Sequence, residues 1–159
     1  MEAAQNMAVS PPEIDGCTTV PTLFRQRIRE HPDKIAIREK DFGIWNEYSW
    51  SHYGEIARHA GLGLKALGLE RGDVCSVASE VNKEWMFADL GIICMGGVTN
   101  GVYPTDSPNQ VEYLITDSGT RFYFAEDEEQ LDKVLEVRER TPTLAKVIIF
   151  DMEGLRHLD

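Results

Sequence analysis

The sequence predicts an α/β protein with a doubly wound, mostly parallel sheet, preceded by an N-terminal helix and β-hairpin. From residue 73 to residue 150, short β-prone runs alternate with helical segments in the order β-α-β-α-β-α-β, which is typical of a parallel sheet. The last run, Val147-Ile148-Ile149-Phe150, is wholly apolar, as in a strand buried on both faces. Residues 83–95 are almost entirely apolar, so we expect a helix that is covered on more than one side.

The residues before the first parallel strand form an entry section. Residues 1–21 are polar and small and contain three prolines, so we expect a disordered or loosely docked lead. Thr22 is a suitable N-cap for a short helix that ends before Pro32, because the residue before a proline avoids the helical region. Two β-prone runs on either side of the turn Asp41-Phe42-Gly43 then predict a β-hairpin.

A long helix follows the hairpin and leads into a βαβ unit. Ser49 or Ser51 caps the helix, whose apolar residues recur at helical spacing through Leu67. The unit itself consists of strand 74–78, a helix capped by Asn82, and a second strand that ends before Pro104. Its crossover is expected to be right-handed.

Two further helices complete the alternation. Asp106 or Ser107 begins the first, with Pro108 in a position that suits the first turn of a helix. A strand over 121–125 comes next. The acidic run Glu126–Glu129 then begins the second helix, where carboxylates complement the helix dipole; cation binding by this run is the alternative.

The composition excludes several classes of protein. Sixteen basic residues against twenty-seven acidic ones give a net charge of -11, which repels a nucleic-acid backbone. The chain has neither a run of about 18 apolar residues nor a secretory signal pattern at its start. Cys17, Cys75 and Cys94 form no C-x-x-C pair, so we expect buried, reduced thiols in a cytoplasmic protein, with a disulfide or a metal site as the alternative.

No motif in the chain completes a catalytic site. Gly61-Leu62-Gly63 and Gly68 lie in a helical pattern and follow no strand, so they predict close helix packing and not a nucleotide loop. His52, Glu55 and His59 share one helix face, but a metal site needs more donors, and a solvated face is the expectation. We therefore expect no catalytic, cofactor-binding or metal-ligating residue in this segment.

The carboxyl ends of the predicted parallel strands are where a ligand is expected. They correspond to residues 79–82 and 103–107. Tyr103 and Thr105 offer an aromatic ring and a hydroxyl there and are the candidate site-rim residues. The alternative is that these loops only pack and cap helices.

Several short segments follow one another in an informative order: Tyr48-Ser49-Trp50, Leu67-Gly68-Leu69-Glu70-Arg71-Gly72-Asp73-Val74, Asn82-Lys83-Glu84-Trp85, Met95-Gly96-Gly97-Val98, Gly101-Val102-Tyr103-Pro104-Thr105-Asp106-Ser107 and Tyr113-Leu114-Ile115-Thr116-Asp117-Ser118. In this order and spacing, the chain from about Thr22 to Phe150 resembles the N-terminal part of the adenylate-forming acyl-CoA synthetases. It looks most like the long-chain fatty-acid and bubblegum-type members. Val81 departs from the family, which often has proline before the asparagine.

The resemblance implies an AMP-binding ligase of fatty-acid metabolism that uses ATP, Mg²⁺ and coenzyme A. A fatty acid and ATP would form an acyl-adenylate and pyrophosphate, and coenzyme A would then displace AMP. The family's phosphate loop, aromatic-threonine-glutamate segment, ribose-binding aspartate and C-terminal lysine domain have no counterpart in these residues. Residues 22–159 are therefore expected to be an incomplete N-terminal part of such an enzyme's large domain, a scaffold and acyl-pocket wall that alone is inactive and binds no cofactor.

Two other interpretations stay open. The chain could be a stand-alone small α/β module that binds an intact synthetase, or a second copy of itself, through the helix Lys83–Met95. It could also be a free flavodoxin-like nucleotide-binding domain, which is disfavoured because no phosphate loop follows a strand. In the ligase interpretation the partners are the remainder of the synthetase and a fatty acid. The expected location is cytoplasmic, with peripheral contact with a membrane surface left open.

Overall fold

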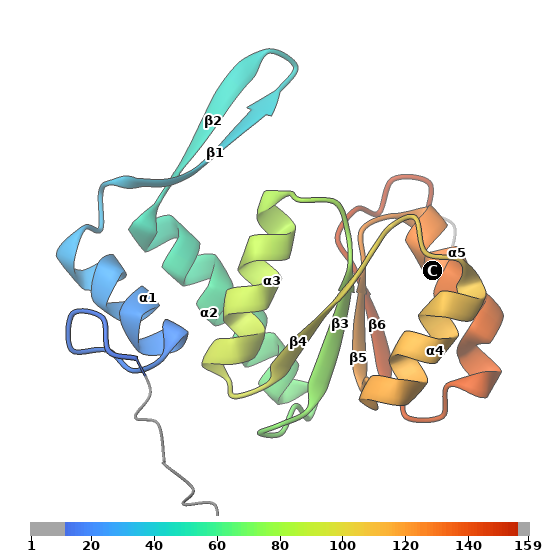
Figure 1. The fold of residues 1–159 in the computed structure, drawn as a ribbon. Helices are drawn as coiled ribbons and strands as arrows, with labels where there is room; N and C mark the ends of the chain where they lie inside the picture. Colours follow the sequence, from blue (N-terminus) through green and yellow to red (C-terminus); the bar gives the residue numbers. More distant parts are fainter. Residues whose placement is uncertain (1–11, 156–159) are drawn as a thin grey trace, which may run out of the picture.

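The computed structural model describes residues 12–155, and Figure 1 shows their arrangement. Residues 1–11 of the expected lead lie outside the described residues. The elements are α1 Val20–Glu30, β1 Ile35–Asp41, β2 Ile44–Ser49, α2 Trp50–Ala66, β3 Val74–Ala78, α3 Lys83–Cys94, β4 Val98–Val102, α4 Pro108–Ser118, β5 Phe122–Ala125, α5 Glu128–Val137, a 3-10 turn Arg138–Arg140 and β6 Lys146–Ile149.

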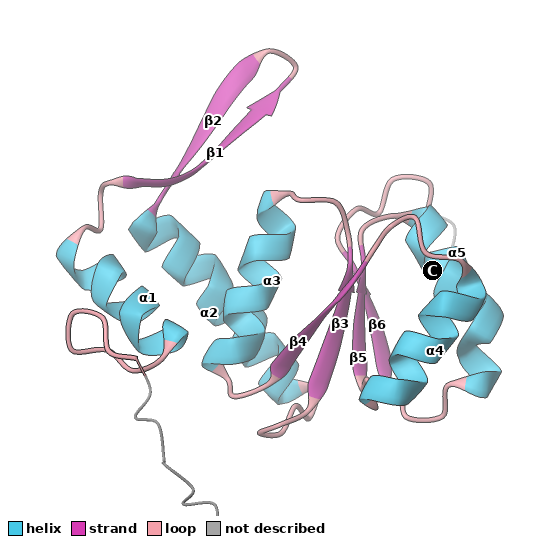
Figure 2. Ribbon diagram, in the orientation of Figure 1, coloured by secondary structure: helices cyan, strands magenta, loops and turns pink. Residues whose placement is uncertain are grey.

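The strands form two sheets (Figure 2). Strands β1 and β2 make an antiparallel hairpin, and the other four make a parallel sheet in the order β4-β3-β5-β6. Helices α2 and α3 lie on one face of this sheet, and α4 and α5 lie on the other. The predicted α/β fold with a parallel sheet and an N-terminal hairpin is confirmed.

Both faces of the sheet are buried, as the strand β5 illustrates. Phe122 and Phe124 pack with α2 and α3, whereas Tyr123 and Ala125 pack with α4 and α5. All four side chains are buried. Side chains alternate between the two faces of a strand, so each pair of neighbouring residues contributes one side chain to the core on each face of the sheet.

Helix α3 is enclosed by several elements, as its apolar sequence predicts. Phe87 and Leu90 belong to a cluster with α1, α2 and the base of the hairpin, while Ala88 and Ile92 pack with α2 and the sheet. The hydroxyl of Tyr53 donates to the carbonyl of Met86 at 3.0 Å. Cys94, expected to be buried, is exposed, because it lies in the last turn of α3 and lines an open hollow beside α1 and α2. Cys75 is buried, as expected.

Three local expectations are wrong. The N-cap of α1 is Thr19 and not Thr22; Thr22 occupies the third helical position, where the two hydroxyl groups cap each other's backbone amides and Pro21 suits the first turn. The strand β6 is half-buried and not covered on both faces, since it forms an edge of the described sheet. Finally, α5 begins at Glu128 with Asp127 as its cap, so Glu126 precedes the helix.

Among residues 12–155, the structure contains no helix with the length and apolar character that a membrane-spanning helix needs.

Candidate functional site

The parallel sheet changes its winding direction at the strand β3. Strand β3 has β4 on one side and β5 on the other, and the connecting helices α3 and α4 lie on opposite faces. The chain therefore reverses its direction of travel across the sheet between β3 and β5. Ligands of open α/β sheets bind beside such a reversal, outside the carboxyl ends of the strands.

The carboxylate of Glu126 fills this position by joining the two loops. It accepts a hydrogen bond from the backbone amide of Glu80 at 2.7 Å and another from Nδ2 of Asn82 at 3.0 Å. Oδ1 of Asn82 caps α3 by accepting from the amide of Trp85 at 2.9 Å. Both polar ends of Asn82 and both oxygens of Glu126 are thus used within the protein.

The sequence predicted that Asn82 caps α3, but it did not predict the hydrogen bonds between Glu126 and the β3–α3 loop. The strand register could have indicated this contact. Ala78 of β3 pairs with Ala125 of β5, so the residues that follow these two strands leave the sheet beside each other.

Lys83 ties the hairpin to this edge. Its ammonium group forms ion pairs with Glu39 of β1 at 2.8 Å and with Glu84 at 2.9 Å. Burial alone would lower the pKa of Lys83, but the hydrogen bonds with the two carboxylates outweigh it and raise the pKa. Lys83 therefore stays charged and paired.

The hollow beside these groups is acidic. It measures about 390 Å³ and is lined by Glu39, Asn82, Lys83, Glu84, Glu126, Asp127, Phe150 and Asp151. Five carboxylates against one ammonium group do not fit a triphosphate, since phosphate oxygens need cations or free amide donors. Within residues 12–155 no cluster of three or more histidine, cysteine, aspartate or glutamate side chains is placed to hold a metal ion.

The predicted rim residues lie at the carboxyl end of the neighbouring strand β4. Tyr103 and Thr105 are both exposed. Tyr103 lines a hollow of about 280 Å³ with Asp106, Tyr113 and three other residues, whereas Thr105 is not part of its lining. The carbonyl of Pro104, between the two, accepts a hydrogen bond from the ammonium group of Lys133 on α5. The loop is therefore anchored, and a ligand role for Tyr103 and Thr105 stays a prediction.

The His52, Glu55 and His59 side chains on α2 are exposed, as expected of a solvated face.

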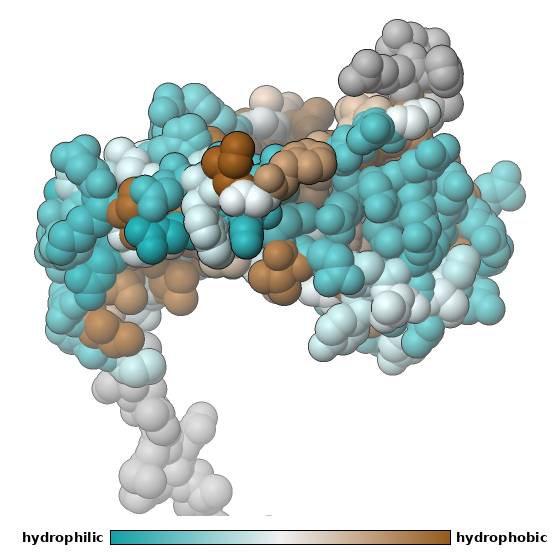
Figure 3. All heavy atoms as spheres, turned by 90° about the horizontal axis from the view of Figure 1, so that it is seen from above, coloured by the Kyte–Doolittle hydropathy of each residue, from teal (hydrophilic) through white to brown (hydrophobic). Residues whose placement is uncertain are grey.

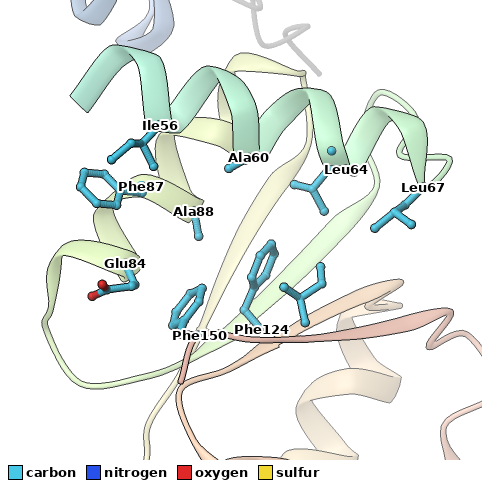
Figure 4. Close-up of a pocket in the computed structure, with 11 residues that line it drawn as sticks. Ile56, Ala60, Leu64, Leu67, Glu84, Phe87, Ala88, Phe124 and Phe150 are labelled. Atoms are coloured by element: carbon cyan, nitrogen blue, oxygen red, sulfur yellow. The ribbon is translucent and has the colours of Figure 1, made fainter. Parts of the chain in front are cut away.

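An apolar groove lies on the face of the sheet that carries α2 and α3 (Figure 4). It measures about 340 Å³. Its lining comes from α2, from α3 and from the sheet, and Glu84 is its only charged residue: Ile56, Ala60, Gly63, Leu64, Leu67, Glu84, Phe87, Ala88, Phe124, Ile148 and Phe150. The centres of the Phe124 and Phe150 rings are 5.6 Å apart. This surface suits an apolar ligand or an apolar protein segment.

The sequence pattern did not locate this groove, although the apolar helix from Lys83 pointed to an incompletely covered core.

Comparison with known proteins gives a consistent picture. Residues 24–158 match the family model described as AMP-binding enzyme. The chain is 30% identical over 132 residues to the cattle (Bos taurus) protein named long-chain-fatty-acid–CoA ligase ACSBG1, which covers 83% of this chain and 18% of that protein. It is also 30% identical over 140 residues to long-chain-fatty-acid–CoA ligase FadD15 of Mycobacterium tuberculosis, covering 88% of this chain and 23% of that one. The chain thus spans about a fifth of the length of these relatives.

Solved structures share the fold. A fatty acyl CoA synthetase of Mycobacterium tuberculosis superposes with a TM-score of 0.73 at 17% identity, covering 86% of this chain and 27% of that one. The N-terminal domain of FACL13 from the same organism gives 0.73 at 18% identity, covering 86% and 35%. The anthranilate CoA ligase AuaEII, solved with anthranoyl-AMP, gives 0.75 at 20% identity, covering 84% and 26%.

Proposed function

We propose, from the premise that this chain belongs to the AMP-binding enzyme family, that it forms the N-terminal part of the large domain of a long-chain fatty-acid–CoA ligase. The observation that carries the proposal is the family match over residues 24–158, together with relatives named as long-chain ligases over more than four fifths of the chain. Residues 22–159 would then be one partial domain, with the βαβαβαβ core over 73–150.

The reaction would be that of an adenylate-forming ligase. A fatty acid and ATP with Mg²⁺ would give an acyl-adenylate and pyrophosphate, and coenzyme A would then release AMP and leave as the thioester. The acidic hollow at the carboxyl edge does not fit the phosphates. We therefore assign no step of this chemistry to residues 12–155 and expect the chain alone to be inactive and to bind none of these cofactors.

The role of this segment is to support the rest of the enzyme and to shape its acyl pocket. The apolar groove between α2, α3 and the sheet supports this role, because a long acyl chain needs walls without unpaired polar groups. Tyr103 and Thr105 are proposed as residues at the rim of the site, since they follow a parallel strand at its carboxyl end.

A second candidate function is a stand-alone module that binds an intact synthetase or a second copy of itself. The apolar groove also favours this candidate, because Phe87 and Ala88 of α3 line it. Within α3, Cys94 is the one exposed residue, and it lines a separate hollow beside α1 and α2. Sedimentation of the chain, alone over a range of concentrations and mixed with an intact synthetase, tests this candidate. Self-binding makes the apparent mass rise with concentration, and binding to the synthetase makes the two proteins sediment together.

We also propose a cytoplasmic location with peripheral contact at a membrane surface. Cys17, Cys75 and Cys94 are free thiols, as is common in reducing compartments. Long-chain fatty acids partition into membranes because each buried methylene contributes about 0.8 kcal/mol, so a ligase of this class would meet its substrate there.

A chimera tests the proposed function. The matching segment of the cattle ligase would be replaced by residues 22–155 of this chain, and palmitoyl-CoA formation from palmitate, ATP and coenzyme A would be measured. We expect activity in the chimera and none in a control that lacks the segment. A folded chimera that is no more active than the deletion control would contradict the proposal. Fatty-acid-dependent ATP–pyrophosphate exchange by the 159-residue chain alone would contradict its expected inactivity.

A further inference from the structure

The hairpin β1–β2 carries its largest apolar side chains at its tip. It projects away from the rest of the molecule (Figure 1). Phe42 is 99% exposed, Ile44 is 69% exposed and Trp45 is 59% exposed. Ile44 and Trp45 are adjacent in a strand, so they point to opposite faces of the hairpin. The tip therefore carries a large apolar side chain on each face and at its turn, with Asp41 opposite Ile44 and Lys40 opposite Trp45.

The turn itself is locally unfavourable. Asp41 pairs with Ile44, which leaves the two-residue loop Phe42-Gly43, and φ is +44° at Phe42 and +85° at Gly43. Positive φ at both positions is typical of a type I′ turn, whose first position favours asparagine or aspartate. A bulky residue with positive φ is a conformational outlier. The fold therefore places a phenylalanine at its most exposed point, although asparagine would suit the backbone better.

Charged residues flank the tip and continue behind it. Arg38 and Glu47 form a cross-strand ion pair at 2.9 Å, and Glu39 is paired with Lys83. The ammonium group of Lys40 lies 5.8 Å from the centre of the Trp45 ring. A tryptophan at the inner end of an apolar tip, beside a lysine, is an arrangement that suits the boundary between lipid headgroups and acyl chains.

We propose that the tip Phe42–Trp45 is a reversible membrane-contact site that inserts into the interfacial layer of a lipid bilayer. A protein surface would bury one face of the hairpin, whereas a lipid layer surrounds the tip and covers both faces and the turn. The negative charge of Asp41 and the positive charge of Lys40 cancel beside the tip, and the whole chain carries a net charge of -11. The apolar side chains, and not anionic headgroups, would therefore drive binding.

This inference rests on the proposed function and refines its membrane contact. The ion pair between Glu39 and Lys83 ties the hairpin to the loop after β3, so the tip projects on the side of the carboxyl edge of the sheet (Figure 1). A hollow of about 540 Å³ separates the hairpin from residues 81–83. Figure 3 views the molecule from this end, where brown apolar atoms interrupt the teal polar surface. Insertion of the tip would bring the edge where ligands are expected close to membrane-dissolved fatty acids.

The test is binding of the 159-residue chain to phosphatidylcholine vesicles, measured by co-sedimentation and by the blue shift of tryptophan fluorescence. We expect Phe42→Asn to weaken binding by about tenfold or more, the factor expected from losing one buried aromatic side chain. The same variant should unfold at a higher denaturant concentration than the parent, so its weaker binding would not reflect misfolding. Ile44→Thr should weaken binding as well, and Leu135→Gln, at an exposed residue of α5, should leave it unchanged.

Three outcomes would overturn the inference. They are absence of binding by the parent chain, unchanged binding by Phe42→Asn, and binding only to vesicles enriched in phosphatidylserine. If the parent self-associates without binding vesicles, and Phe42→Asn abolishes the self-association, the tip is a contact between copies and the membrane inference also fails. The assay contains no ATP or coenzyme A, so its failure is distinguishable from failure of the ligase proposal.

Discussion

Two glycines of α2 make a matched pair for testing how closely α2 and α3 pack. Gly61 is buried, and a Cβ atom there would lie 2.8 Å from the carbonyl oxygen of Gly91 and 2.8 Å from Cγ of Met95. Gly63, two residues along the same helix, is exposed, and a Cβ atom there would meet nothing within 4 Å. We predict that Gly61→Ala destabilises the protein and that Gly63→Ala stabilises it.

The magnitudes follow from two opposing terms. Alanine is favoured over glycine in a helix interior by about 1 kcal/mol, so Gly63→Ala should raise the free energy of unfolding by about that amount. Gly61→Ala gains the same helix propensity but adds a methyl group to a closed interface, which costs about 1–3 kcal/mol. One of the close neighbours is the backbone carbonyl oxygen of Gly91, so the clash can be relieved only if the two helices move apart. We therefore expect a cost in the upper part of that range. The variants should then differ by about 2–3 kcal/mol.

Thermal unfolding followed by circular dichroism measures this difference. For a protein of this size, 1 kcal/mol corresponds to about 3 °C in Tm, so the two variants should melt about 6–9 °C apart. Gly91→Ala should also lower Tm, since its Cβ atom would lie 3.0 Å from the carbonyl oxygen of Ala57. Equal Tm values for Gly61→Ala and Gly63→Ala would refute the close approach of the helices.

Three further predictions concern single side chains. Tyr123→Phe should raise stability by about 1 kcal/mol, because the buried Tyr123 hydroxyl has no hydrogen-bond partner within residues 12–155; urea unfolding checks this, and a loss of stability would contradict it. Asn82→Ala should lower the unfolding free energy by about 1–2 kcal/mol by removing the α3 cap and the donor to Glu126, and Asn82→Ser, which keeps a cap, should recover part of that loss in the same assay. Iodoacetamide at about pH 8 should label Cys94 well before Cys75 in the native chain, as measured by peptide mass spectrometry. Only the thiolate reacts, and burial raises the pKa of both thiols, but Cys94 is exposed, whereas Cys75 is buried and its pKa is raised to about 12 by burial and the nearby Asp73. Earlier labelling of Cys75 would contradict this prediction.

The fold was predictable because its main signals are local. The alternation of apolar strands and helices from Asp73 onward gives the parallel sheet, and the apolar character of 83–95 gives a helix enclosed on several sides. Close packing was also predicted for the glycines of α2, and it holds for Gly61. It does not hold for Gly63, because only one of the two residues faces α3, and the pattern of glycines alone does not say which.

The site was less predictable because its contacts join residues that are far apart in the sequence. The acidic run Glu126–Glu129 reads as the start of a helix, which is correct for its last two residues. Glu126 instead turns toward a loop more than 40 residues earlier, and only the neighbouring positions of β3 and β5 bring the two together. Likewise, the half-buried state of β6 depends on which strand lies at the edge of the sheet, and the apolar sequence does not specify that.

The charges at the carboxyl edge do not favour the binding of a phosphate group. Of the residues that line the hollow there, only Lys83 is a cation, and Glu39 and Glu84 already pair with it. The Glu126 carboxylate is in turn satisfied by two donors within the chain. A group that binds a reacting phosphate must have free donors or an unpaired positive charge. These side chains instead fix the hairpin and the β3–α3 loop at one edge of the sheet. Under the proposed function, we expect the phosphate-binding groups of the ligase to come from other segments.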